Sequence, residues 1–482
     1  MKIGLISLGC PKNLVDSEVM LGLAHDAGHE LTTDAWSADV LVVNTCAFID
    51  SAKQESIDAI LEMAELKKSG SARRLIVTGC LAERYRDELR AQIPEIDAVL
   101  GTGEVPDIVR AIGRVATPMT FYRASALAQM EPAHPGETSP ELTSAREVSG
   151  GGSSAPSPQP PASRPSYIYD AETPRLLATP RHYAYVKIAE GCDYKCAFCI
   201  IPTLRGAYRS RPADSIVREA QALAQRGVKE LLLISQDTTF YGIDRQERGA
   251  PARLLRQLNA VDGLEWIRLL YLYPTTIDDE TLAAMADCEK VCKYIDLPLQ
   301  HASNPVLKRM KRPGTRQTYD QLLTRIRARV PGVALRTTFI VGFPGESNAD
   351  VDQLCGFVDD HRFDHVGVFT YSHEDGTSAY ALTDDVAARG KAARRARVMG
   401  LQKRLVRTRN RGRIGERARM VIDGPASDHE LVLKGRLSTQ APDIDASVFL
   451  TECDPSRFAS GDFAEVEIVA ARNYDLVARP VL

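Results

Sequence analysis

Cys192-Asp-Tyr-Lys-Cys196-Ala-Phe-Cys199 places three thiols within one short segment, in the spacing C-x3-C-x2-C. The segment follows a strand-like run at 183–189 and Gly191, a residue that allows the backbone to turn. Thiolates are soft ligands that suit iron–sulfur clusters and zinc. Because structural zinc takes four closed ligands, three thiolates favour a four-iron cluster with one iron open to a substrate or cofactor. A zinc knuckle and three buried core cysteines are the alternatives.

Strands and helices alternate around this segment. Apolar runs typical of buried parallel strands occur at 183–188, 230–235, 266–272, 293–297, 335–341 and 365–370, and all but the last are followed by helical or loop sequence. This order predicts an open (β/α)6 partial barrel over residues 181–410. Ligands in such barrels bind at the carboxyl ends of strands, where the following residues fall: Cys192, Gln236-Asp237, Gln300-His301 and Gly342-Phe-Pro-Gly-Glu346.

The first 123 residues contain three more strands that end in cysteine, at 2–10, 38–46 and 74–80. Helical periodicity near 16–28, 51–69 and 82–92 separates them, which predicts βαβ units and a parallel α/β domain. Ligands of open α/β sheets bind outside the carboxyl ends of the strands. Cys10, Cys46 and Cys80 are therefore expected to converge into a second three-thiolate cluster site. The alternative is that a small cysteine packs at each strand end.

The composition changes sharply after this domain. Residues 131–180 hold ten of the 27 prolines, and a disordered Pro/Ser/Gly-rich linker is predicted over 124–180. The basic run 391–413 predicts a solvated helix that leads to the last domain. Short alternating stretches after residue 417 then predict a small barrel of four or five strands, in a domain over 411–482.

Length and charge bound the function. With 482 residues the chain can form about three domains, and it has no apolar run long enough to span a membrane. The net charge of −3 gives no overall nucleic-acid signature, and ten cysteines in so long a chain do not suggest a secreted disulfide scaffold. We therefore expect a cytoplasmic protein. Residues 417–482 hold seven Lys and Arg against eleven Asp and Glu, a net charge of −4 that suits a basic protein partner better than RNA.

Several motifs resemble a known family. The C-x3-C-x2-C segment, with Phe198 before its last cysteine, resembles the signature of radical S-adenosylmethionine (SAM) enzymes, and the last barrel resembles a TRAM domain. The order of the three domains is similar to that of the methylthiotransferases. Four segments resemble the branch that modifies an aspartate of small ribosomal subunit protein S-twelve: 6–18, 204–211, 296–301 and 440–445. The long linker departs from the family pattern.

The resemblance implies a chemistry for each cysteine triad. It implies two [4Fe-4S] clusters, one on Cys192, Cys196 and Cys199 that cleaves SAM, and one on Cys10, Cys46 and Cys80 that presents sulfur. A 5′-deoxyadenosyl radical would then abstract hydrogen from the aspartate β-carbon. A low-potential electron donor is implied as a partner. No catalytic side chain is assigned, and the candidates for cofactor binding are Gly342, Pro344, Gln236 and Asp237.

Other functions make different predictions. A tRNA adenosine methylthiotransferase predicts a basic terminal barrel, which this sequence does not have. A non-catalytic iron–sulfur electron carrier needs neither open iron sites nor a recognition barrel. Arg205, Arg209 and Arg211 after the cysteine segment are typical of a solvated basic loop, or of a loop that faces an acidic substrate.

Overall fold

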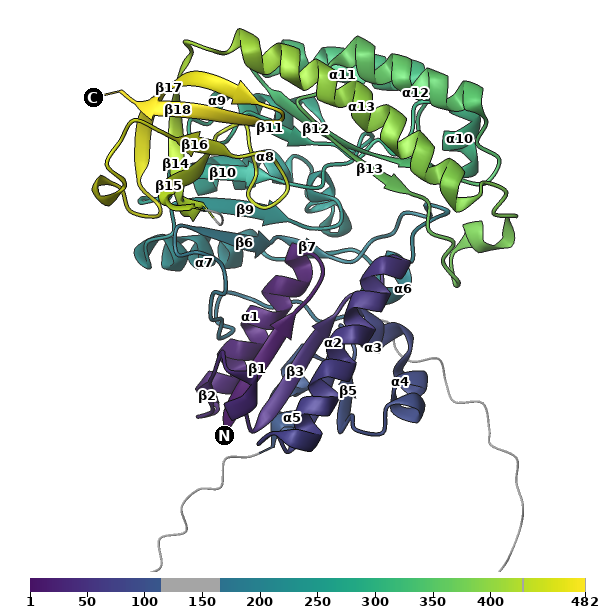
Figure 1. Cartoon of the computed structure of the whole chain (residues 1–482), viewed down its shortest axis with the longest axis vertical. Helices are drawn as coiled ribbons and strands as arrows, with labels where there is room; N and C mark the ends of the chain where they lie inside the picture. Colours follow the sequence, from purple (N-terminus) through teal and green to yellow (C-terminus); the bar gives the residue numbers. More distant parts are fainter. Residues whose placement is uncertain (114–164, 427–428, 482) are drawn as a thin grey trace, which may run out of the picture.

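The computed structural model describes residues 1–113, 165–426 and 429–481. Figure 1 shows three folded parts: an amino-terminal α/β domain, a central arrangement of strands and helices, and a small carboxyl-terminal β-barrel. The fold class predicted from the sequence is confirmed. Over the described ranges, no helix is long and apolar enough to cross a membrane.

The amino-terminal domain is a parallel five-stranded sheet in the order β2-β1-β3-β4-β5. Its strands are β1 (Lys2–Ser7), β2 (Glu30–Leu31), β3 (Val40–Thr45), β4 (Arg74–Gly79) and β5 (Ala98–Leu100). Its helices are α1 (Pro11–Asp26), α2 (Asp50–Ser69), α3 (Cys80–Arg84), α4 (Arg86–Gln92) and α5 (Ile108–Ile112). Helix α1 begins five residues earlier than its periodicity predicts, because Pro11 has the backbone angle that suits a first helical position.

The central domain contains the six predicted strands, paired in parallel as two three-stranded sheets, β10-β9-β6 and β11-β12-β13. A parallel bridge between Ile267 and Val291 joins the two sheets. The strands are β6 (Tyr183–Lys187), β9 (Glu230–Ile234), β10 (Trp266–Leu269), β11 (Tyr294–Asp296), β12 (Ala334–Val341) and β13 (His365–Thr370). A short antiparallel pair, β7 (Ala189–Glu190) and β8 (Arg209–Ser210), flanks the cysteine segment.

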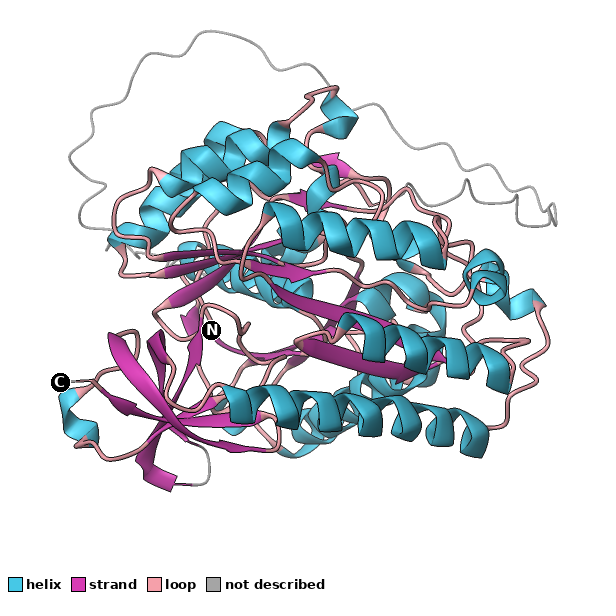
Figure 2. Cartoon of the chain, turned by 90° about the horizontal axis from the view of Figure 1, so that it is seen from above, coloured by secondary structure: helices cyan, strands magenta, loops and turns pink. Residues whose placement is uncertain are grey.

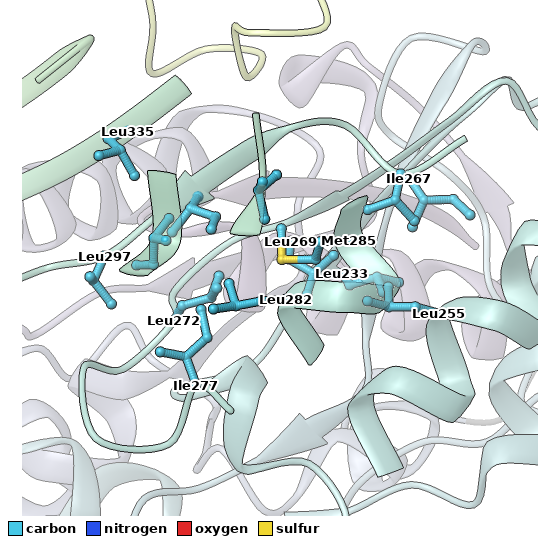
Figure 3. Packing of buried hydrophobic residues seen from close by; sticks show 14 of the residues in the cluster. Leu233, Leu255, Ile267, Leu269, Leu272, Ile277, Leu282, Met285, Leu297 and Leu335 are labelled. Atoms are coloured by element: carbon cyan, nitrogen blue, oxygen red, sulfur yellow. The ribbon is translucent and has the colours of Figure 1, made fainter. Parts of the chain in front are cut away.

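Helices cover the outer side of these strands (Figure 2). They are α6 (Ile201–Arg205), α7 (Ala213–Gln225), α8 (Ala250–Asn259), α9 (Asp279–Asp287), α10 (Asn304–Arg309), α11 (Arg316–Arg329) and α12 (Asn348–His361). Alternate strand residues such as Leu233, Ile267 and Leu335 belong to one buried cluster with Leu255 and Met285 of the helices (Figure 3). Apolar area removed from water contributes about 25 cal/mol per Å2, so this large core holds the strand ends in place.

The inner face of the strands is covered by the other two domains. Tyr185, Leu232 and Tyr294 belong to one buried cluster with Val15 and Val19 of α1 and with Ala441 from the carboxyl-terminal barrel. The amino-terminal domain therefore packs directly on the partial barrel.

Helix α13 (Ala388–Gly412) connects the central domain to the last one. The predicted barrel has five strands and is closed, in the order β14-β15-β16-β18-β17. The strands are β14 (Arg417–Ala426), β15 (His429–Leu437), β16 (Val448–Leu450), β17 (Phe463–Arg472) and β18 (Asp475–Pro480).

The end of the predicted linker is part of the folded structure. Residues 124–164 of that linker lie outside the described ranges, but 165–180 make defined contacts. Tyr169 is buried, and Arg175 pairs with Glu18 of α1 and Glu219 of α7, each at 2.6 Å. The prediction of disorder is wrong for residues 165–180. Composition does not show that Arg175 forms ion pairs with buried carboxylates of other elements.

Candidate active site

The first cysteine triad lies at one edge of the amino-terminal sheet. Cys10 precedes α1, Cys46 follows β3, and Cys80 opens α3 directly after β4. Gly9 has a φ of +89°, and a Cβ placed on it would lie 3.1 Å from the sulfur of Cys46. The turn before Cys10 therefore rests against Cys46.

Asn13 holds the three cysteine segments together. Its side-chain amide donates to the carbonyl oxygens of Leu8, at 3.0 Å, and of Thr45, at 2.8 Å. Its Oδ1 accepts from the thiol of Cys80, at 3.6 Å. One buried side chain thus touches the segments that carry all three thiols.

The electrostatics of this triad favour thiols until a metal group binds. Burial raises the pKa of the Cys80 thiol to about 12, against the charge of Arg205, and negative charge on Cys10 and Cys46 would raise it further. Burial also raises the pKa of Cys46. Metal groups bind the thiolate and release its proton. Nowhere in the described parts of the chain do three His, Cys, Asp or Glu side chains approach closely enough to hold a single metal ion. A four-iron cluster differs because its three thiolates bind three separate irons.

The second triad lies in the loop between β7 and α6. Gly191 turns the chain with a φ of +87°, and the amide of Cys192 donates to the carbonyl oxygen of Gly206 at 3.1 Å. The amide of Ala197 donates to Met310, which ties the loop to the end of α10. Burial raises the pKa of Cys192 to about 11 and that of Cys199 to about 12. All three cysteine residues are partly exposed.

An aromatic and cationic wall lies beside Cys196. Arg312 donates to the sulfur of Cys196 at 3.6 Å, and its guanidinium lies 4.1 Å from the ring centre of Tyr273. Tyr273 stacks on Tyr194 of the cysteine loop, with ring centres 3.8 Å apart. Hydrogen bonds to cluster sulfurs are one of the factors that set a cluster's reduction potential.

The candidates Gln236 and Asp237 follow β9 beside this wall. Asp237 accepts from the hydroxyls of Tyr194, at 2.7 Å, and Thr276, at 2.9 Å, and burial raises its pKa. It therefore anchors the cysteine loop. Gln236 donates to Glu190 at 2.6 Å, while its buried Oε1 has no partner within the described structure. Of the two candidates, Gln236 is therefore better placed than Asp237 to accept a hydrogen bond from a ligand.

The candidates Gly342 and Pro344 belong to a tight loop after β12. Gly342 has a φ of +76°, and Glu346 accepts hydrogen bonds from the amides of Gly342 and Phe343. Arg309 donates to the Pro344 carbonyl oxygen at 3.1 Å. His301 is fully buried, and its Nε2 lies 3.5 Å from Glu346. The loop is thus held from both sides beneath the mouth of the barrel.

A buried ion-pair network, which we call the junction cluster, links the two domains that carry the triads. It consists of Asp16, Lys187, Glu190 and Arg205. Arg205 lies 2.8 Å from Asp16 and 3.1 Å from Glu190, and its second terminal nitrogen lies 3.7 Å from the sulfur of Cys80. Burial opposes ionisation of Glu190, but the charges of Arg205 and Lys187 outweigh it and hold the pKa of Glu190 well below its usual range.

The sequence reasoning missed most of this network. It interpreted Arg205, Arg209 and Arg211 as a solvated or substrate-facing loop, and the structure contradicts this for two of them. Arg205 is buried in the junction cluster, and Arg211 is buried against Glu219 at 2.6 Å. Paired buried charges leave no signal in composition. The only available signal was that Asp16 and Arg205 both lie in segments that resemble the family.

Comparison with protein families gives a match in each domain. Residues 2–101 match the uncharacterized protein family UPF0004, 186–358 match the radical SAM superfamily, and 414–481 match the TRAM domain.

Curated relatives match over the whole chain. A protein of Solibacter usitatus named ribosomal protein uS12 methylthiotransferase RimO is 46% identical, over 99% of this chain and 94% of its own length. Proteins of the same name from Koribacter versatilis and Geobacter sulfurreducens are 45% and 43% identical, each over 99% of this chain and over 96% and 98% of their own lengths.

Among solved structures, the radical SAM methyltransferase TsrM from Kitasatospora setae, with cobalamin and a [4Fe-4S] cluster bound, is similar in fold. The TM-score is 0.51 at 15% identity, over 77% of this chain and 72% of TsrM.

Proposed function

Because the chain belongs to the RimO family of ribosomal protein uS12 methylthiotransferases, we propose that its two cysteine triads hold two [4Fe-4S] clusters with separate roles in one reaction. The protein is a radical SAM transferase that acts on uS12, the small-subunit protein S-twelve, and it uses an iron–sulfur cluster and SAM. The proposed product is an aspartate of uS12 with a methylthio group on its β-carbon. We place the reaction in the cytoplasm, with electrons from a low-potential donor.

The junction cluster is the observation that carries this proposal. Arg205 lies at the end of the helix that follows Cys199, yet it reaches the sulfur of Cys80 in the other domain. Its partner Glu190 precedes Cys192 by two residues. The junction cluster therefore connects Cys80 of the first triad to the segments on both sides of the second triad in the chain, which supports two clusters that serve one substrate.

The donor sets fit two clusters of this kind. Cys192, Cys196 and Cys199 would hold the cluster that supplies the electron for reductive cleavage of SAM, and Cys10, Cys46 and Cys80 would hold the cluster that supplies sulfur for transfer. The chain itself positions the reactants: Asp237 anchors the cysteine loop through Tyr194, and Glu346 holds the loop at Gly342. Fixed positioning of this kind removes a large entropic part of a reaction barrier.

The acidic carboxyl-terminal barrel supports a protein substrate. Its net charge of −4 over 417–482 attracts a basic protein and repels a phosphate backbone. A tRNA methylthiotransferase would need the opposite charge on this domain.

Two cysteine substitutions test the division between the triads. Anaerobically reconstituted wild-type protein is expected to hold about eight irons per chain. Cys46→Ala should retain about half of that iron and still form 5′-deoxyadenosine from SAM, but the mass of uS12 should not increase. Cys196→Ala should lose the cleavage of SAM as well.

Cys355→Ala is the matched control, because Cys355 is a partly exposed cysteine of helix α12 outside both triads. It should leave iron content and product unchanged. Equal loss of SAM cleavage in Cys46→Ala and Cys196→Ala would contradict separate roles. Modification of tRNA in place of uS12 would overturn the assigned substrate.

A further inference from the structure

Helix α13 is the most strongly charged element of the described structure. Its 25 residues include ten Lys and Arg and no Asp or Glu. Val398, Gln402, Val406 and Asn410 form its buried side. The opposite side exposes six cations, and the spacing of seven, three and four residues between Arg397, Arg404, Arg407 and Arg411 places these four on one face of a helix. We call these residues the basic face: Arg389, Arg397, Lys403, Arg404, Arg407 and Arg411.

The cations on the two sides of α13 differ in whether they have ion-pair partners. On the inner side, Lys391, Arg394 and Arg409 pair with Asp384, Glu346 and Asp364. On the basic face, Arg397 pairs with the exposed Asp352 at 2.6 Å. The other five cations have no ion-pair partner within the described parts of the chain.

Repulsion between these cations makes the basic face a favourable site for an anion. Lys403, Arg407 and Arg411 follow one another at intervals of four residues. Like charges at this spacing repel one another and destabilise an isolated helix. The basic face extends over about 33 Å at 1.5 Å per residue, which is long enough to follow several phosphates of a nucleic-acid strand.

We propose that the basic face binds the RNA phosphate backbone of the small ribosomal subunit, so that the enzyme recognises uS12 in its RNA-bound state. This inference rests on the proposed function. A ribosomal protein bound to its RNA presents a positively charged protein surface beside negatively charged phosphates. This enzyme presents the complementary pair, an acidic barrel beside the basic face. Helix α13 leads directly into the acidic barrel, and Asn410 donates to the carbonyl oxygen of Tyr474 there at 3.1 Å.

The features of the helix favour RNA over an anionic membrane. A helix that lies on a membrane inserts an exposed apolar face below the lipid headgroups. The apolar side of α13 is instead buried, because Val398 belongs to the core of the central domain and Gln402 donates to the carbonyl oxygen of Phe363. Phosphate contacts position a protein without reading sequence, so the basic face would orient the enzyme while the acidic barrel contacts uS12.

The test compares one reaction on two forms of the substrate. Reconstituted wild-type enzyme and the variant Lys403→Gln/Arg407→Gln/Arg411→Gln are assayed on free uS12 and on purified small subunits. The variant should lose about tenfold in kcat/KM or more on subunits and stay within about twofold on free uS12.

The matched control removes the same charge from another surface. Arg226, Arg248 and Arg253, on and beside α7 and α8, are exposed and form no ion pair within the described chain. Their triple replacement by Gln should change neither rate. The inference would be overturned if the wild-type enzyme modifies free uS12 and the basic-face variant shows the same ratio of kcat/KM on small subunits to kcat/KM on free uS12. That result would leave the proposed function intact. Absence of activity on both substrates would instead reject the proposed function.

A binding measurement gives a second readout that needs no turnover. The affinity of the holoenzyme for 16S ribosomal RNA should fall steeply with salt, and the triple variant should reduce the slope of log K against log salt by about three, or one for each lost phosphate contact. The single variant Arg407→Gln should reduce it by about one, which keeps the test valid if the triple variant folds poorly. An unchanged slope, or binding to vesicles of anionic phospholipid but not to RNA, would contradict the proposal.

Discussion

Single residues set the geometry of the cysteine loop. Gly191 has a φ of +87°, and a Cβ on it would lie 2.0 Å from the carbonyl oxygen of Ala207. No side chain of another residue can yield at that point, because the obstacle is backbone. The loop that carries Cys192 therefore requires glycine for two reasons, the left-handed conformation and the close approach of the segment after α6.

We predict that Gly191→Ala displaces the cysteine loop. Iron content after reconstitution should fall by about half, with loss of SAM cleavage, because the triad of Cys192, Cys196 and Cys199 no longer converges. Gly227→Ala is the control: Gly227 also has a positive φ, of +94°, but nothing lies within 4 Å of its added Cβ. It should cost about 1 kcal/mol of stability and no iron. Normal iron content in Gly191→Ala would show that the loop can shift without losing the site.

At the scale of elements, one loop of the carboxyl-terminal barrel closes the bottom of the central domain. This floor loop, residues 438–447 between β15 and β16, lies at the amino-terminal ends of the central strands. Tyr294 donates to Asp445 at 2.7 Å, and Arg268 donates to the carbonyl oxygen of Ser438 at 2.7 Å. The carboxyl-terminal barrel is thus a structural part of the catalytic domain as well as a candidate recognition surface.

We predict that Asp445→Asn weakens this connection. Asp445 accepts from Tyr294 and from the amide of Ala441 and lies 3.4 Å from Arg336, so loss of its charge should cost about 2 kcal/mol and lower the thermal midpoint. Asp443→Asn is the matched control, since Asp443 makes only longer contacts, at 3.3 and 3.5 Å, and Asn tolerates its positive φ. Equal midpoints for the two variants, measured by thermal unfolding of the full-length protein, would reject this account.

At the scale of the whole molecule, buried charge pairs hold the three domains together. The junction cluster joins the first two domains, and Arg436 joins the last two because it pairs with Glu230, at 2.7 Å, and with Asp423, at 2.9 Å. Burial opposes ionisation of both carboxylates, but the charge of Arg436 keeps the pKa of Glu230 below its ordinary value, and a hydrogen bond from His182 acts with it at Asp423.

These pKa shifts predict how stability depends on pH. A carboxylate with a lowered folded-state pKa stabilises the protein above its unfolded pKa, near 4, and this stabilisation is lost as pH falls through the folded value. Arg436→Met should therefore lower the thermal midpoint strongly at pH 7, by an amount equivalent to about 3–5 kcal/mol, since Glu230 and Asp423 each lose a cationic partner. The difference in thermal midpoint between Arg436→Met and the wild type should become smaller below about pH 4. A gap that stays constant over this range would show that Arg436 acts through packing alone.

The sequence by itself determined the features that depend on neighbours along the chain or on simple counts. The spacing of Cys192, Cys196 and Cys199 fixes three thiols in one loop, and buried strand patterns gave the order of the three domains. The charge of residues 417–482 follows from composition alone. These inferences needed no knowledge of packing, because local spacing and periodicity already restrict what the backbone can do.

Tertiary structure decided the features that depend on residues far apart in the chain. The pairing of Arg205 with Asp16, the contacts of Asn13 with Thr45 and Cys80, and the pairing of Arg175 with Glu18 join residues more than 30 positions apart. An arginine in a polar loop has the same sequence signature whether it is solvated or buried. Its burial depends on whether folding places carboxylates around it, since an unpaired charge is too costly to remove from water.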